Sequence, residues 1–164
     1  MKDKHIIKVG ISSAAIAHSP DLLRTTGLGS CVGVVLYDEA NERAGLAHIL
    51  LPDSSLAKSE PIHIFKYADS SIPWLIDRLT AAGANRNALK AKIAGGAQMF
   101  PSFSGSDTIR IGERNIEAVS HLLKKAAITV TGSDVGGVTG RTIEFNPQTQ
   151  QLRIRKINEP VIYI

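Results

Sequence analysis

The amino-acid sequence predicts an α+β protein, a single-domain sandwich of mixed β-sheets with two main helices packed against them. Three observations predict this class. Short apolar, β-branched runs are joined by turns of hairpin length, as between residues 31–38 and 44–52. Two longer segments, 64–82 and 115–127, carry apolar residues at helical spacing. Strands and helices do not alternate regularly, so a doubly wound parallel sheet is not expected.

The first third of the chain is expected to supply an opening strand and then a hairpin. Residues 6–11 are predicted as the opening strand, and a turn is expected around residues 19–21. The run CVGVVLYD, residues 31–38, is continuously apolar and β-branched, which indicates a strand buried on both faces. Residues 39–42 form a polar turn, and AGLAHILLP, residues 44–52, is the returning strand.

The rest of the chain is expected to supply both helices and four more strands. The helix predicted over 64–82 has Gly83 as its C-cap residue, and Pro73 either kinks it or marks its first turn. The helix predicted over 115–127 has one apolar face and two lysines in its last turn. The strands are expected at AKIAGG, ITVTGSD, RTIEFN and QLRIRKI.

Length and composition indicate one globular domain spanning residues 1–164. Apolar residues make up 43% of the chain and charged residues 21%, which is typical of a folded protein that is not disordered. No apolar run approaches the roughly 18 to 20 residues that cross a bilayer, so membrane insertion is not expected. The N-terminus lacks an apolar signal core, and we expect a cytoplasmic protein.

The net charge of +4 raises the question of a nucleic-acid partner. The basic residues are spread along the chain, and only 5% of residues are aromatic. No stretch interleaves aromatic with basic residues, as a stacking platform for bases does. We therefore expect a solvated basic surface and no nucleic-acid binding.

Cys31 is the one cysteine in the chain, so an internal disulfide and a cysteine-rich zinc site are excluded by count. If the hairpin turn occupies residues 39–42, Cys31 lies opposite Leu50 on the returning strand. His48 is two residues from Leu50 on that strand, so it is a diagonal neighbour of Cys31. Side chains alternate faces along a strand, so Cys31 and His48 project from the same face. Only a shift of one residue in register would separate them. The hairpin thus selects His48 among five histidines.

A cysteine beside a histidine is the arrangement needed for nucleophilic attack on a carbonyl. A free thiol is mostly protonated at neutral pH, and a neighbouring imidazole removes the proton and later delivers it to a leaving amine. The glycines of GLGSC, just before the strand, let the backbone approach a substrate and donate to an oxyanion. The competing interpretation is structural, because cysteine and histidine in an apolar hairpin also occur as ordinary core residues.

Other candidate sites are weaker. Ser30 neighbours Cys31 but lacks the GxSxG pattern and should point to the opposite face. The glycine runs IAGGAQ and GSDVGGVTG lack the spacing and lysine of a phosphate-binding loop. Asp134 could orient a base, but the sequence does not place it near His48. No two histidines and a carboxylate are spaced along the sequence as metal ligands are, so neither a metal nor a cofactor is expected.

The sequence resembles the CheD family of chemoreceptor glutamine deamidases. Most of the chain carries the family's motifs in order: SPDLLRTTGLGSCVGV, GLAHILLP, KYAD, IAGGAQMF, IGERNIEAV and DVGGVTGR. The resemblance implies Cys31 as nucleophile, His48 as base and acid, and Thr25 as the residue that positions the histidine. The choice of Thr25 rests on the resemblance alone, because Thr26 is chemically equivalent in sequence terms.

The resemblance also implies a substrate, a partner and a fold relative. The substrate would be the helical cytoplasmic region of chemoreceptors, and the partner the chemotaxis phosphatase CheC. Some family members also hydrolyse glutamyl methyl esters, and the fold is similar to that of cysteine deamidase toxins. Two alternatives stay open: a regulatory partner of CheC with little catalysis, and a thiol protease or amidase. A monomer is expected, since no coiled-coil heptads occur.

Overall fold

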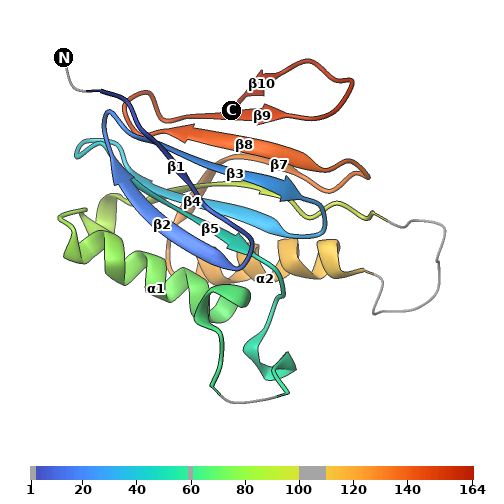
Figure 1. The fold of residues 1–164 in the computed structure, drawn as a ribbon. Helices are drawn as coiled ribbons and strands as arrows, with labels where there is room; N and C mark the ends of the chain where they lie inside the picture. The colour runs from blue at the N-terminus through green and yellow to red at the C-terminus, as the bar shows by residue number, and fades with distance from the viewer. Residues whose placement is uncertain (1–2, 59–60, 100–109) are drawn as a thin grey trace.

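Two five-stranded sheets lie face to face, and the helices α1 and α2 cover the outer face of one of them (Figure 1). The computed structural model describes residues 3–58, 61–99 and 110–164. Both sheets are mixed: β1 pairs with β3 and β6 with β7 in parallel, and the remaining neighbours are antiparallel. The predicted α+β class is confirmed.

We call the sheet that the helices cover the middle sheet and the other one the outer sheet. The outer sheet has the strand order β1-β3-β8-β9-β10, and the middle sheet has the order β2-β5-β4-β6-β7. The outer-sheet strands are β1 (Ile6–Lys8), β3 (Leu22–Leu28), β8 (Arg141–Asn146), β9 (Gln151–Arg155) and β10 (Ile162–Tyr163). The middle-sheet strands are β2 (Ser13–His18), β4 (Val32–Asp38), β5 (Arg43–Ile49), β6 (Lys90–Gly95) and β7 (Thr129–Val135). The helices are α1 (Ala68–Ala81) and α2 (Ile111–Lys125), with short 3-10 turns at Ser54–Leu56, Ile64–Lys66 and Arg86–Ala88.

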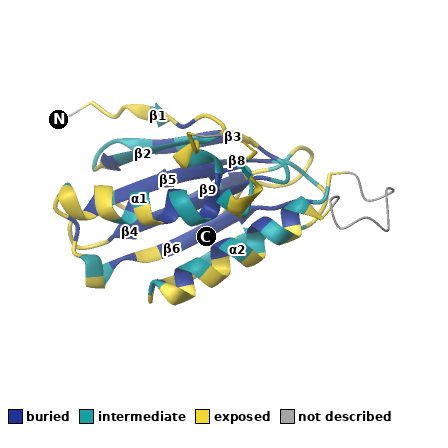
Figure 2. Cartoon of the chain, turned by 90° about the horizontal axis from the view of Figure 1, so that it is seen from below, coloured by how far each residue is buried: buried dark blue, intermediate teal, exposed yellow. Residues whose placement is uncertain are grey.

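The middle sheet is buried on both faces, which explains the continuous apolar character of its central strand. Every residue of β4 is buried (Figure 2). One face packs against Ile72, Leu75 and Leu79 of α1 and against Val119 and Leu123 of α2. The other face meets the outer sheet in a second apolar core. Removal of this apolar surface from water is the main stabilising contribution to the fold.

The predicted opening strand over 6–11 is wrong in extent, because the chain changes sheets within it. β1 ends at Lys8, and β2, which was not predicted, begins at Ser13 in the other sheet. Ser12 has a φ of 52°, in the left-handed region, and reverses the chain between the two strands. Only the packing of one sheet on the other reveals that the two short strands belong to different layers.

Both predicted helices exist with different bounds. The first begins at Ala68, because Tyr67 is extended and separates it from the 3-10 turn, so Pro73 lies inside it and does not mark its first turn. Gly83 follows the helix with a φ of 106°, as expected of a C-cap residue. The second helix begins four residues before the predicted start, at Ile111. Of the IAGGAQMF motif, Phe100 lies outside the described residues.

Candidate active site

The hairpin of β4 and β5 has the register that the sequence predicted. Asp38 pairs with Arg43, and Gly33 pairs with His48. The last pair of the hairpin is Val32 with Ile49, and one further step along this register places Cys31 opposite Leu50, so Cys31 and His48 project from the same face. That face is the one that meets the outer sheet, and both side chains are buried, with 5% and 1% of their surface exposed.

Thr25 reaches His48 from the opposite sheet. It lies on β3 and is buried, whereas its neighbour Thr26 is exposed. Its Oγ1 lies 2.6 Å from the carbonyl oxygen of Val9 and 2.7 Å from Nδ1 of His48. The register of β3 against β8 shifts immediately after Thr25, and such bulges are frequent beside active sites. The structure therefore separates two threonines that the sequence leaves equivalent.

The two hydrogen bonds of Thr25 define the protonation of the His48 ring. A carbonyl oxygen can only accept, so the single hydroxyl proton of Thr25 is donated to Val9. Nδ1 of His48 must then carry a proton and donate it to Oγ1. In the neutral ring this leaves Nε2 unprotonated. Nε2 is buried and has no hydrogen-bond partner among the described residues, so its lone pair is free to accept a proton.

Burial favours the uncharged forms of both Cys31 and His48 at neutral pH. Desolvation lowers the pKa of His48 to about 4, so the imidazole is neutral. Burial also raises the pKa of the Cys31 thiol, and the Cys31 backbone N–H opposes this only in part. Both shifts favour a protonated thiol and a neutral imidazole over a thiolate and an imidazolium.

Glycines hold the backbone around Cys31 in place. The Cys31 carbonyl accepts a hydrogen bond of 2.8 Å from the N–H of Gly96, and the Gly29 carbonyl accepts one of 2.8 Å from Ala97. Gly95 has a φ of 109°, and a Cβ there would overlap with the Cys31 carbonyl oxygen. The GLGSC segment and the AGG segment can approach this closely only because Gly95 has no side chain.

Asn115 is a site residue that sequence reasoning missed. It is fully buried in α2, and its Nδ2 donates to the Ser30 carbonyl at 2.9 Å and to the Leu50 carbonyl at 3.0 Å. It therefore links the residue before Cys31 to the residue that directly follows β5, the strand that carries His48. Its Oδ1 is buried without a partner among the described residues. Asparagine is unfavourable inside a helix, so its presence in the predicted helix was the one feature of the sequence that could have pointed to Asn115.

The remaining candidates are placed elsewhere. Asp134 does not orient His48, because its carboxylate bridges Arg141 at 3.0 Å and Lys156 at 3.1 Å. The other four histidines are exposed: His5, His18, His63 and His121. In the described ranges no group of three His, Cys, Asp or Glu residues could hold a metal ion. None of the helices there is long and apolar enough to cross a bilayer.

Fold and site together define a class: an α+β protein in which a buried thiol and a buried imidazole share one face of a β-hairpin, with a hydroxyl behind the imidazole. The family model described as CheD chemotactic sensory transduction matches residues 50–156. A chemoreceptor glutamine deamidase CheD of Halalkalibacterium halodurans is 51% identical over 154 residues, covering 94% of this chain and 95% of the relative. The corresponding Bacillus subtilis protein is 47% identical and covers 94% and 93%. The chain belongs to the CheD family.

Among solved structures, a Bacillus licheniformis hypothetical protein YfiH aligns with a TM-score of 0.47 and 16% identity. The alignment covers 76% of this chain and 50% of that one. A likeness of this degree carries no argument about the chemistry of this chain. The similarity to cysteine deamidase toxins stays a prediction.

Proposed function

We propose that this chain is a chemoreceptor glutamine deamidase that converts glutamine side chains to glutamate, with Cys31 as nucleophile and His48 as base and acid. One observation carries the proposal. The Thr25 hydroxyl fixes the His48 tautomer whose free Nε2 lone pair lies on the same strand face as the Cys31 thiol. The names of the relatives supply the substrate class.

The reaction begins with formation of a thioester. Nε2 of His48 takes the thiol proton while the Cys31 sulfur bonds to the carboxamide carbon of the substrate glutamine. The tetrahedral oxyanion is held by the Cys31 backbone N–H and a neighbouring donor. The Nε2 proton then passes to the amide nitrogen, the carbon–nitrogen bond breaks, and ammonia leaves. Throughout, the Thr25 hydroxyl oxygen accepts a hydrogen bond from Nδ1–H, which keeps its proton, and so holds the ring in place.

Hydrolysis of the thioester completes the cycle. Water attacks the acyl carbon while Nε2 of His48 removes its proton, the carbon–sulfur bond then breaks, and the Nε2 proton passes to the sulfur to give glutamate and the Cys31 thiol. A glutamyl methyl ester would form the same acyl-enzyme with methanol as leaving group, so methylesterase activity is included in the proposal. Residues 1–164 would act as one domain, as a monomer, on the cytoplasmic helical region of the receptor.

The phosphatase CheC is the proposed protein partner, and one observation favours a purely regulatory alternative. Cys31 is 5% exposed and its pKa is raised by burial, as in an inert core cysteine. In that alternative the chain binds CheC and has little catalytic activity. A thiol protease or amidase is the second alternative, and peptide cleavage instead of ammonia release would reveal it.

The test is the intact mass of a purified chemoreceptor cytoplasmic fragment after incubation with the wild-type protein, with Cys31→Ala and with Ser30→Ala. The proposal requires a gain of about one dalton per site with matching ammonia release, present in wild type and Ser30→Ala and absent in Cys31→Ala. An unchanged fragment mass with wild-type protein would favour the regulatory alternative. Loss of activity in Ser30→Ala alone would reassign the nucleophile.

A further inference from the structure

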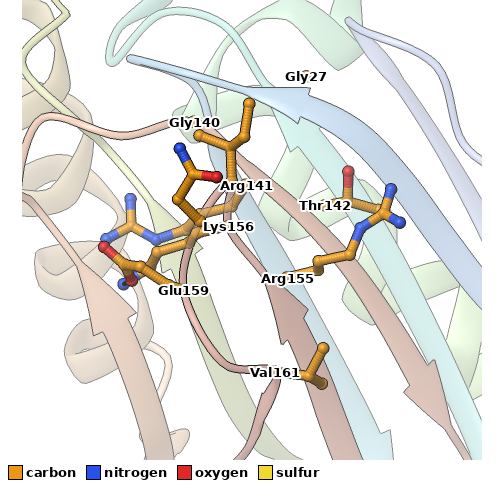
Figure 3. Close-up of a pocket in the computed structure, with 10 residues that line it drawn as sticks. Gly27, Gly140, Arg141, Thr142, Arg155, Lys156, Glu159 and Val161 are labelled. Atoms are coloured by element: carbon orange, nitrogen blue, oxygen red, sulfur yellow. Dashed lines mark ion pairs between the residues drawn. The ribbon is translucent and has the colours of Figure 1, made fainter.

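A basic pocket opens beside the glycine turn that precedes Cys31 (Figure 3). Its volume is about 540 Å³. Gly27 and Gly140 form one side, and the facing wall comes from the start of β8 and the end of β9, where Thr142 and Arg155 are paired across the strands. The proposed chemistry at Cys31 uses none of these side chains.

The charges of the pocket leave one cation without a partner. Asp134, next to the pocket lining, forms ion pairs with both Arg141 and Lys156, and Glu159 lies 3.6 Å from Lys156. Arg155 is exposed and forms no ion pair with any described residue. Three cations against two carboxylates therefore give the pocket a net charge of +1, centred on the Arg155 guanidinium.

The groups at this end of the pocket suit a carboxylate. Arg155 and Thr142 are partners on adjacent antiparallel strands, and Figure 3 shows the guanidinium beside the Thr142 hydroxyl. A guanidinium offers a planar pair of N–H donors that matches the two oxygens of a carboxylate, and a hydroxyl can add a third donor. A Cβ at Gly27 would meet no atom within 4 Å, so the opposite wall is open to an incoming side chain.

Gly27, on one side of the pocket, lies within the span of a helix whose glutamine occupies the site. Gly27 precedes Cys31 by four residues, so their Cα atoms are at most about 14 Å apart. The turn shortens this span, because the Gly29 N–H bonds to the Gly27 carbonyl at 3.1 Å. Along an α-helix, residues four and seven positions from the glutamine are displaced by about 6 and 10 Å and lie on nearly the same face.

We propose that this pocket is a specificity subsite for an acidic side chain of the substrate. It binds the carboxylate of an aspartate or glutamate located one or two helical turns from the target glutamine, through Arg155 and Thr142. The proposal rests on the proposed deamidation at Cys31 and adds a rule for substrate choice: glutamines with such an acidic neighbour are preferred.

Binding in the Cys31→Ala background tests the subsite separately from the chemistry. The probe is the purified chemoreceptor cytoplasmic fragment, and a second fragment has its acidic residues within two turns of each glutamine replaced by neutral ones. Arg155→Ala should weaken binding of the first fragment about tenfold and Arg155→Lys by less, in keeping with loss of one charge-assisted contact. The same substitution should have little effect on the neutralised fragment.

Arg153→Ala is the matched control, because Arg153 lies two residues earlier on the same face of β9 and does not line the pocket. If Arg153→Ala and Arg155→Ala weaken binding equally, the effect is due to general surface charge and the subsite proposal is wrong. The proposal is also wrong if neither substitution weakens binding. If the wild-type protein does not deamidate the fragment but binding still depends on Arg155 and on the acidic residues, the subsite stands and the deamidase proposal falls.

Discussion

The Thr25 hydroxyl lies between the Val9 carbonyl, at 2.6 Å, and Nδ1 of His48, at 2.7 Å, and so determines which nitrogen of His48 carries the proton. The contact joins the two sheets, because Thr25 belongs to β3 and His48 to β5. A hydroxyl in this place orients the imidazole without adding a buried charge.

Removal of the Thr25 hydroxyl should lower turnover more than substrate affinity. Thr25→Val keeps the shape but leaves the His48 Nδ1–H and the Val9 carbonyl without a partner. We expect kcat to fall at least roughly tenfold with KM nearly unchanged, and stability to fall by about 1–3 kcal/mol. Steady-state kinetics and urea unfolding measure both. Thr25→Ser should restore activity, and Thr26→Val is the exposed control; equal losses in Thr25→Val and Thr26→Val would contradict the assignment.

The stability of the protein should fall as pH drops below the ordinary pKa of histidine. Burial lowers the pKa of His48 to about 4 from 6.5, so between these values the unfolded chain binds a proton that the folded chain does not. The stabilising contribution is present above pH 6.5 and is lost towards pH 4. From pH 7 to pH 5 the loss should be about 2 kcal/mol. Denaturant unfolding of wild type and His48→Gln checks this, and equal slopes with pH would disprove it.

Alkylation of the thiol should report the raised pKa of Cys31. Burial raises this pKa above its ordinary value, and Cys31 is the only cysteine, so labelling reads one site. The rate of reaction with iodoacetamide should be low at pH 7 and should still rise above pH 9, because the thiolate is the reactive form. A rate that levels off below pH 8 would instead indicate a preformed thiolate.

Asn115 should matter to both stability and catalysis. Asn115→Ala leaves the Ser30 and Leu50 carbonyls without their donor, and we expect a loss of about 2 kcal/mol together with a lower kcat. Asn115→Asp should be worse, because it places a carboxylate oxygen against two carbonyl oxygens. His121→Ala, at an exposed position of the same helix, is the control. Wild-type kcat in Asn115→Ala would show that the tie has no part in positioning the site.

Gly112 should behave in the opposite way to an ordinary helical glycine. Replacement by alanine usually stabilises a helix by about 1 kcal/mol. Here a Cβ at Gly112 would lie 2.5 Å from the carbonyl oxygens of Gly96 and Ala97, which are backbone atoms and cannot rotate away. Gly112→Ala should therefore lower the midpoint of thermal unfolding. Gly10→Ala, where a Cβ would meet nothing within 4 Å, should leave it nearly unchanged; stabilisation by Gly112→Ala would refute the packing argument.

Local pattern sufficed where the interacting residues are close in sequence. The hairpin register follows from a short turn and from the period of two along its strands, and it placed Cys31 and His48 on one face. The helices were recognised from apolar spacing, but their starts were not, since Tyr67 and Arg110 lack side-chain capping hydrogen bonds. The division of 6–18 into two strands depended on sheet packing and was missed.

The sequence by itself determined the α+β class, the shared strand face of Cys31 and His48 and the glycine segments beside them, because each is encoded within a few neighbouring residues. Only the tertiary structure chose Thr25 over Thr26, brought Asn115 to the backbone beside Cys31, and assigned Asp134 to Arg141 instead of His48. These contacts join residues from 7 to 85 positions apart. Their formation depends on how sheets and helices pack, and the period of a single strand or helix does not contain that information.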